Sequence, residues 1–313
     1  MTGEAAAMTI SVIIPHLNQP GMLARCLAAL AEGRRRADEI IVVDNGSAAL
    51  PSEVCAAHPG VMLLSEPTPG PGPARNLGVA HARGDVLAFI DADCIADLSW
   101  LAVAETALAD PEAEILGGDV RIALADPARP TMLEAYESVY AYRMDLYIAK
   151  QDFAATCNMV IRRQVFDSVG SFGGLDVAED RDWGQRARAR GHDLRYVAAM
   201  RVYHPARPDF AGIFAKWDRH SAHDYEAARH RSTGRLRFAA KALFMGVSPL
   251  AEVLRLARSD RISGLRARVL AFIALTRVRA HRARVMAWLL AGGDPARLSG
   301  RWNRSEPAVR PLE

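Results

Sequence analysis

Two groups of acidic residues have spacings typical of side chains that act together in chemistry. Asp91 and Asp93 flank one alanine directly after an apolar run, so their carboxylates could bind Mg²⁺ or Mn²⁺ together with ligand phosphates. Glu179 and Asp180 begin the second group, an acidic cluster that leads into a predicted helix. A solvated turn also explains the first pair, because two aspartates at this spacing are common by chance.

Three further polar residues occupy positions where side chains often contact ligands. Asp44 precedes an Asn-Gly pair and could organise that turn or accept a hydrogen bond from a ligand. Arg75 stands near the start of a predicted helix after a Pro/Gly-rich loop, where it could meet phosphate or ribose oxygens or simply lie on the surface. His204 ends a predicted strand, and a lone histidine at such a position is more often structural.

Short apolar segments alternate with helical periodicity up to about residue 205. The predicted strands are 9–14, 39–43, 61–65, 86–90, 114–122, 155–161 and 196–203, and the predicted helices are 21–32, 74–82, 131–148 and 182–190. Ser47 is a candidate cap for a helix after the second strand. The alternation predicts an α/β fold with a mostly parallel sheet flanked by helices. Ligands bind such sheets at the carboxyl ends of the strands, where Asp44 and Asp91 fall.

From about Phe210 onward the pattern is helical only and rich in arginine. Pro249 is expected to kink or break one helix. An apolar stripe at helical spacing comprises Leu236, Ala240, Leu243, Val247, Leu250 and Leu254. These basic helices could lie on an anionic membrane surface, pack on the α/β domain or form a homo-oligomer interface. No nucleic-acid recognition motif is present. The predicted domains are 1–209, 210–304 as a basic α-helical extension, and 305–313 as a flexible tail.

Composition limits the class of protein further. The chain has 313 residues and a formal net charge of +3, which suits one catalytic-size domain with an appendage. Its four cysteines lack metal-site spacing and predict free thiols in a reducing compartment. We expect no signal peptide and no membrane-spanning segment, because the apolar runs are too short. The expected location is the cytoplasm, including the inner face of the cell membrane.

Five motifs, in this order, resemble glycosyltransferase family 2, the inverting enzymes of GT-A fold. They are ISVIIP (10–15), IVVDNGS (41–47), ARNLG (74–78), IDAD (90–93) and EDRDW (179–183). The resemblance covers about residues 9–205 and implies a Rossmann-like, mostly parallel mixed sheet flanked by helices, here with an α-helical C-terminal extension. It also implies transfer of a sugar from a nucleoside-diphosphate sugar to an acceptor hydroxyl, in bacterial polysaccharide or glycoconjugate synthesis.

The same resemblance assigns roles to individual residues. Those implied to bind the nucleotide sugar are Pro15, Asn18, Asp44, Arg75, Asp91 and Asp93. Asp93 and His204 would hold Mn²⁺ or Mg²⁺, and Asp180, beside Glu179, would be the general base. Asp44 would accept from the imide N–H of the base, which favours a UDP-sugar. The acceptor would be a saccharide or a lipid-linked molecule, and Trp183 could either stack on a sugar or be a buried helix residue.

Two alternatives remain open at this point. The chain could be a non-catalytic nucleotide-sugar or carbohydrate-binding protein of the same fold. It could also be a sugar-1-phosphate nucleotidyltransferase, although the Gly-rich activating loop of that class is missing. A dinucleotide oxidoreductase is not expected, because residues 15–21 read PHLNQPG where such an enzyme has a G-x-G-x-x-G motif.

Overall fold

The chain folds into two compact units that alternate along the sequence. The structure, a computed structural model, describes residues 8–175 and 177–299. One unit contains the described residues up to Arg121 together with Tyr142–Pro205, and the other contains Ile122–Ala141 and the described residues from Ala206 onward. The structure thus divides the chain near Pro205 but gives one segment of the predicted first domain to the helical unit. The predicted tail, 305–313, lies outside the described residues.

Among the described residues, eight strands form one mixed sheet. They are β1 (Ile10–His16), β2 (Glu39–Asp44), β3 (Val61–Ser65), β4 (Val86–Ile90), β5 (Ile95–Ala96), β6 (Ile115–Ala123), β7 (Asn158–Arg162) and β8 (Leu194–Pro205). The spatial order is β3-β2-β1-β4-β7-β6-β8-β5. Strands β1 to β4 run parallel, whereas β7 is antiparallel to both β4 and β6. The carboxyl ends of β2, β1 and β4 therefore meet at one edge of the sheet.

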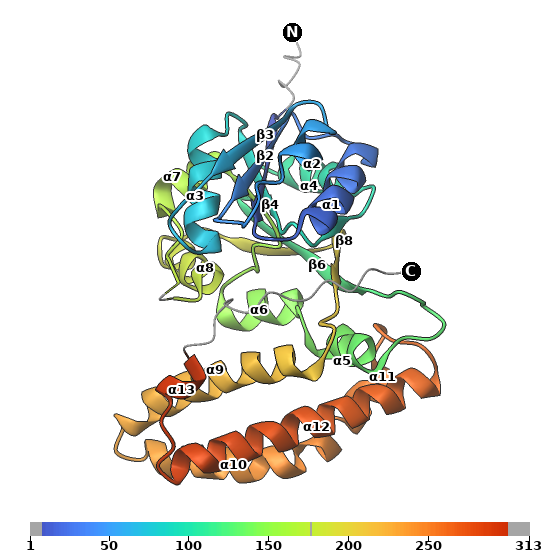
Figure 1. Ribbon diagram of the computed structural model, residues 1–313. Helices are drawn as coiled ribbons and strands as arrows, with labels where there is room; N and C mark the ends of the chain where they lie inside the picture. The colour runs from blue at the N-terminus through green and yellow to red at the C-terminus, as the bar shows by residue number, and fades with distance from the viewer. Residues whose placement is uncertain (1–7, 176, 300–313) are drawn as a thin grey trace. The chain divides into compact units, whose positions relative to one another are not determined.

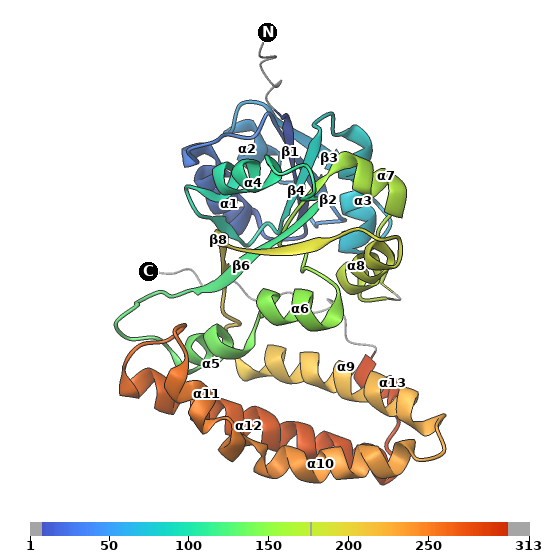
Figure 2. The same ribbon diagram turned by 180° about the vertical axis from the view of Figure 1, so that it is seen from behind.

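Helices cover both faces of this sheet (Figures 1 and 2). They are α1 (Pro20–Glu32), α2 (Ser52–Ala56), α3 (Pro71–His81), α4 (Trp100–Leu108), α6 (Met144–Gln151), α7 (Arg163–Val169) and α8 (Glu179–Ala189). The chain steps outward from β1 to β3 through α1 and α2, then returns through α3 to β4. Because these crossovers are right-handed, α3 lies on the opposite face from α1. The reversal between β1 and β4 opens the crevice where such sheets bind ligands.

The strand sequences explain the burial of the sheet. β4 is fully buried, and β1 and β2 are buried along most of their length, because both faces are covered. Phe89 and Trp100 are among the largest fully buried side chains of this core. Register also matters for the site, because the pairing of β1 with β2 sets His16 directly beside Asp44.

The second unit consists of helices. They are α5 (Met132–Tyr140), α9 (Phe210–Arg229), α10 (Gly234–Ala251), α11 (Val253–Arg258), α12 (Gly264–Leu290) and α13 (Ala296–Ser299). The segment Ile122–Ala141 joins it because Tyr136 and Val139 of α5 share an apolar core with Ile213 of α9 and Leu275 of α12. Among the described residues, no helix combines the length and apolar character needed to span a membrane.

Two sequence expectations differ from the structure, whereas the expected break near Pro249 agrees with it. The predicted helix 131–148 is two helices, because Tyr142 adopts a positive φ of 46° and the chain changes direction there. Ser47 does not cap α2, whose N-cap is Pro51, because its hydroxyl donates to Asp44 instead. Pro249 lies inside α10, which ends two residues later. The Met245 carbonyl, which Pro249 cannot satisfy, accepts a hydrogen bond from the Ser248 hydroxyl.

Candidate active site

Asp44, at the end of β2, is buried under a closed set of hydrogen bonds. Its Oδ1 accepts from the His16 ring at 2.8 Å and from the Ser47 hydroxyl at 2.6 Å. Its Oδ2 accepts from the backbone N–H groups of Gly46 and Ser47. A carboxylate offers about four acceptor positions, so all are filled. Burial raises the pKa of Asp44, but the hydrogen bonds from Ser47 and His16 outweigh this and hold its pKa below the ordinary value.

The tautomer of His16 follows from its two contacts. The Gln19 N–H donates to Nε2 at 3.2 Å, so the proton of the neutral ring sits on Nδ1 and points at Asp44. Asn18 completes this corner: its backbone N–H donates to the Ser47 hydroxyl, and its side-chain oxygen accepts from the Ala48 N–H. The loops after β1 and β2 are thereby joined. Asp44 performs the turn-organising role that the sequence left open beside base recognition.

Arg75 is 2% exposed and connects two carboxylates that lie far apart in the sequence. One terminal nitrogen is 2.7 Å from Asp91 Oδ1, and the other is 3.1 Å from Glu179 Oε1. Burial lowers the pKa of Arg75, but the charges of Asp91 and Glu179 more than reverse this, so the guanidinium stays charged. Its Nε is buried without a hydrogen-bond partner among the described residues. The surface-residue alternative for Arg75 is therefore excluded.

The segment before α8 is packed tightly against α3. The Asn76 side chain exchanges two hydrogen bonds with the backbone of Phe172, at 3.0 and 2.9 Å. A Cβ placed on Gly72 would lie 1.9 Å from the Gly173 carbonyl oxygen, so only glycine fits there. Trp183 is fully buried and its indole N–H donates to the Gly170 carbonyl. Trp183 is therefore a core residue of α8, and the sugar-stacking interpretation is wrong.

Asp180 is partly buried and lies in the first turn of α8 beside Glu179. Burial and the neighbouring Glu179 charge raise its pKa to about 6, although the Arg181 N–H and the Arg75 charge oppose the shift. A carboxylate with this pKa is a stronger base than an ordinary aspartate, yet it is still mostly ionised at neutral pH.

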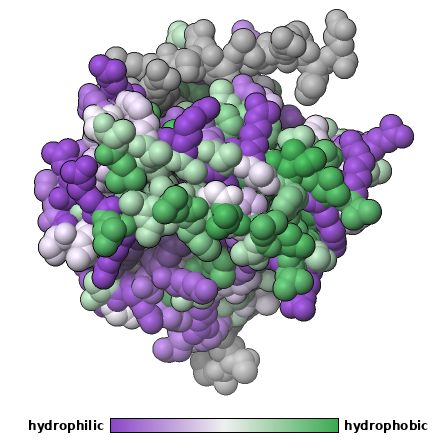
Figure 3. Space-filling model, turned by 90° about the horizontal axis from the view of Figure 1, so that it is seen from below, coloured by the Kyte–Doolittle hydropathy of each residue, from purple (hydrophilic) through white to green (hydrophobic). Residues whose placement is uncertain are grey.

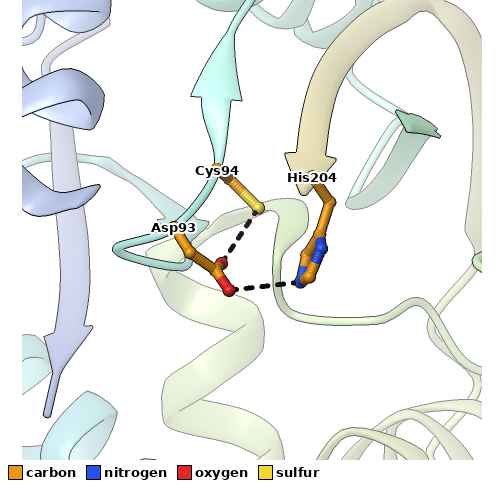
Figure 4. Close-up of side chains that lie close together, drawn as sticks. All are labelled: Asp93, Cys94 and His204. Carbon is orange, nitrogen blue, oxygen red and sulfur yellow. Dashed lines mark hydrogen bonds and ion pairs between the residues drawn. The ribbon is translucent and has the colours of Figure 1, made fainter. Parts of the chain in front are cut away.

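Asp93 and His204 face each other across the ends of two strands (Figure 4). His204 Nε2 is 3.5 Å from Asp93 Oδ2, and the Cys94 thiol lies 3.7 Å from Asp93 Oδ1. Nδ1 of His204 is 2.7 Å from the Pro205 carbonyl, so Nδ1 carries the proton and Nε2 carries the lone pair. The Tyr142 hydroxyl is 2.8 Å from Nε2 and donates to that lone pair.

One oxygen, nitrogen or sulfur atom from each of Asp93, Cys94 and His204 lies within 4.8 Å of the others. Burial raises the pKa of Asp93, His204 lowers it and Asp91 raises it, leaving a net increase that a bound cation would relieve. Cys94 is fully buried, and burial raises its thiol pKa well above the ordinary value. Asp93 and His204 therefore fit a divalent cation as an oxygen and an imidazole ligand, whereas the buried Cys94 thiol is a poor ligand for hard cations.

The predicted site residues thus fall into three groups of the first unit, one of which is Asp93 with His204. Pro15, Asn18 and Asp44 lie at the ends of β1 and β2, and Arg75 joins Asp91 to the acidic start of α8. Sequence reasoning missed four residues that hold these groups in place: His16, Asn76, Cys94 and Tyr142. The strand register opposite Asp44 signals His16, but nothing in the local sequence signals Tyr142, which lies 62 residues before His204.

This sheet order, with carboxylates gathered at the ends of β2 and β4, is that of a GT-A nucleotide-sugar transferase. Two solved structures share the fold. A mannosyltransferase from Pyrobaculum calidifontis in complex with GDP-Man and Mn²⁺ has a TM-score of 0.57 and 17% identity, over 93% of this chain and 89% of that one. S. aureus TarS residues 1–349 in complex with UDP-GlcNAc have a TM-score of 0.52 and 16% identity, over 91% and 92%.

The model of glycosyl transferase family 2 matches residues 11–170, just over half of the chain. The chain therefore belongs to this family. Glycosyltransferase AglE of Haloferax volcanii is 31% identical over 207 residues, which are 64% of this chain and 67% of AglE. The pre-mycofactocin glycosyltransferase of Mycobacterium tuberculosis is 27% identical over 66% of this chain, and the match spans only 45% of that relative. The chain is thus a glycosyltransferase, as its five motifs indicated.

Proposed function

We propose that this glycosyltransferase moves a sugar from a UDP-sugar to an acceptor hydroxyl with inversion at the anomeric carbon, and that it requires Mn²⁺. The observation that carries the proposal is the buried Arg75 bridge between Asp91 and Glu179. It ties the end of β4, where the diphosphate would lie, to the helix that carries Asp180. Donor and proton acceptor are then held at one site.

The residues divide the work of a single displacement. Asp93 and His204 would hold the cation, which when bound offsets the charge on the departing nucleoside diphosphate. Asp180 would take the proton of the acceptor hydroxyl as the new bond forms. Burial raises the pKa of Asp180 most, the Glu179 charge raises it further, and the Arg75 charge lowers it, so Glu179 and Arg75 would act on the base through charge. An imidazole ligand favours Mn²⁺ over Mg²⁺, whose ligands in proteins are mostly oxygens.

The decisive experiment compares Asp180→Asn with Asp182→Asn. Both residues lie in the first turn of α8, but Asp182 pairs with Arg186 at 2.9 Å. Asp180→Asn should abolish transfer while leaving UDP and Mn²⁺ binding unchanged by calorimetry, and Asp182→Asn should keep most of the activity. Normal turnover by Asp180→Asn would remove Asp180 from the role of general base.

Base selection is proposed to occur at the Asp44 corner. A uracil imide N–H could reach Asp44 Oδ1 only if the Ser47 hydroxyl turned away, because that hydroxyl now occupies the oxygen. TarS was solved with UDP-GlcNAc and the mannosyltransferase with GDP-Man, so both bases occur on this fold. Thermal stabilisation by UDP, GDP and dTDP with Mn²⁺ should be greatest for UDP. A larger effect of GDP would contradict the assignment.

The acceptor is proposed to be a saccharide or lipid-linked molecule of bacterial glycan synthesis, met at the inner face of the cell membrane. The competing function is nucleotide-sugar binding without turnover. Slow Mn²⁺-dependent hydrolysis of a UDP-sugar in the absence of acceptor separates the two, because a binding protein would not release UDP. Complete absence of hydrolysis and transfer across a donor panel would favour the binding protein.

A further inference from the structure

The helical unit presents a large apolar surface to solvent. Its members are between 46 and 79% exposed: Leu236, Leu243, Phe244, Val247, Leu250, Val253, Leu254, Leu265, Val269 and Ile273. We call this set the outer face of α10–α12. Hydrophobic side chains form a broad band across the molecule when it is viewed from the side of α10 and α12 (Figure 3). Single exposed leucines are ordinary, but a contiguous group of this kind marks an interaction surface.

The apolar row of α10 lies opposite the side by which this helix packs. Phe238 and Met245 are buried in the helical unit, whereas Leu243, Val247 and Leu250 recur at helical spacing on the other side. A helix of an ordinary water-soluble domain turns polar residues outward. In α10, by contrast, both sides are apolar: one side is buried in the helical unit and the other is exposed.

Contacts between α10 and α12 hold the exposed apolar rows of the two helices side by side. Arg279 of α12 donates to the Ser248 hydroxyl of α10 at 2.8 Å and pairs with Glu252 at 3.3 Å. Met245 and Met286 also belong to the buried parts of these two helices. The exposed rows of both helices are therefore held beside each other as one face rather than as independent strips.

Positive charge surrounds this face. Residues 234–290 contain twelve arginines and lysines but only two acidic residues, Glu252 and Asp260. On α10, helical spacing places the exposed Arg235 on one side of the apolar row and the exposed Arg237 on the other. Lys241 lies on the same side as Arg237 but pairs with Asp224 of α9 at 2.6 Å. Long cationic side chains in these positions can extend their charged ends to phosphate groups while their stems cover apolar surface.

We propose that the outer face of α10–α12 docks on a bilayer surface with anionic headgroups. The leucines and valines enter the interface, and the flanking arginines contact the lipid phosphates. A second copy of this chain fits less well, because pairing two such faces would bring like charges together. The proposal identifies the surface that would bring the protein to the membrane, and it does not depend on which reaction the first unit performs.

The test is flotation of the full chain with lipid vesicles, without detergent. The wild type should bind vesicles of phosphatidylcholine mixed with phosphatidylglycerol, bind pure phosphatidylcholine weakly, and lose binding as salt rises. Leu243→Gln/Val247→Gln/Leu250→Gln should lower the vesicle partition coefficient at least about tenfold. Leu50→Gln/Leu98→Gln is the matched control, because both leucines are about half exposed in the first unit.

Circular dichroism and thermal unfolding establish that each variant is folded. If the triple variant does not fold, the single variant Leu243→Gln replaces it in the flotation test. Arg237→Gln/Arg258→Gln should remove the preference for anionic vesicles, since both side chains are exposed beside the face. Failure of the wild type to float, or unchanged flotation of the leucine variants, would overturn the proposal. A dimer in sedimentation that Leu243→Gln dissociates, without vesicle binding, would assign the face to a second copy.

Discussion

At the scale of single residues, the environment of Asp180 sets a dependence on pH. Burial and Glu179 raise its pKa to about 6, so its protonated fraction grows as the pH falls through that value. A general base works only when ionised. We therefore expect kcat/KM to fall about tenfold per pH unit below pH 6. An ordinary aspartate would keep its activity down to about pH 4.

Rates at fixed Mn²⁺ and UDP-sugar between pH 5 and 8 check this, with UDP binding measured at each pH as the control. Glu179→Gln should move the acid limb to lower pH, because it removes the charge that raises the pKa of Asp180. An acid limb that stays near pH 6 in Asp180→Asn would assign the titration to another group.

Tyr142 yields a second prediction at this scale. Its hydroxyl donates to the His204 lone pair that a cation would need, at 2.8 Å. Tyr142→Phe should therefore tighten Mn²⁺ binding about two- to tenfold, the worth of one hydrogen bond that no longer has to be broken. Calorimetric titration with Mn²⁺ measures the change. Tyr203→Phe in β8 is the control, because successive strand residues point to opposite faces.

The same calorimetric titration with Mn²⁺ tests which side chains are metal ligands. Cys94→Ser should leave Mn²⁺ affinity within about twofold, since a buried, protonated thiol is not a ligand of hard cations. Asp93→Asn and His204→Ala should each weaken binding much more. A large loss in Cys94→Ser, together with preference for Zn²⁺, would show that the thiol coordinates the metal.

Individual residues differ in how far the sequence predicts them. Asp91 and Asp93 stand out because they directly follow an apolar segment, and Glu179 and Asp180 stand out because EDRDW (179–183) resembles a motif of the family. The partner of Arg75 is not visible, because Glu179 lies 104 residues away and only the finished fold brings them together. Tyr142 is hidden for the same reason, and also because a positive φ at tyrosine has no sequence signal.

At the scale of elements, the fit between α3 and the segment before α8 predicts a sensitive position. Gly72→Ala would place a methyl group 1.9 Å from the Gly173 carbonyl, a backbone atom that can move only with its segment. We expect a loss of about 1–3 kcal/mol in unfolding free energy. Transfer activity should fall further, because α8 carries Asp180.

Urea unfolding and initial rates measure the two effects. Gly21→Ala, in the first turn of α1, is the matched control, since a Cβ there meets nothing within 4 Å. This substitution should be neutral or slightly stabilising. Equal behaviour of the two variants would mean that α3 and the Gly173 segment are not tightly packed.

Elements with long apolar runs or clear helical periodicity were predicted within a few residues, including β3 and β4 at their full bounds. The missed boundary between α5 and α6 reflects a local turn inside a continuous periodic pattern. The short strand β5 has no periodicity of its own, and it forms by pairing of Ile95 and Ala96 with β8. The helix α4 was also not predicted, although its buried residues recur at helical spacing.

At the scale of the whole molecule, ligand binding should stabilise the fold by mass action. Mn²⁺ with UDP at about 100 times its Kd should add about 2.7 kcal/mol to the free energy of unfolding. Chelation of the metal should remove this gain, and Asp93→Asn should lack it from the start. Differential scanning calorimetry with and without EDTA measures both. A gain that survives EDTA would show that UDP binds without a cation.

The two-unit organisation could be predicted only in part. The change from an α/β pattern to helices appears near residue 210, close to the end of the first unit at Pro205. The transfer of Ile122–Ala141 to the helical unit could not be seen, because the apolar face of α5 looks the same whichever core it joins. Likewise, the apolar stripe of α10 is visible in the sequence, but its exposure to solvent is not.

The four cysteines offer a consequence for experiments. Cys26, Cys55, Cys94 and Cys157 are all reduced and buried in the first unit. A thiol-reactive reagent can reach them only when this part of the molecule opens, so the labelling rate measures local opening without an engineered probe. The charges of Asp91 and Asp93 raise the pKa of three of these thiols, Cys26, Cys94 and Cys157, so these sulfurs lie near the two carboxylates. Slower thiol labelling in the presence of Mn²⁺ and UDP would therefore show that ligand binding suppresses local opening of the first unit.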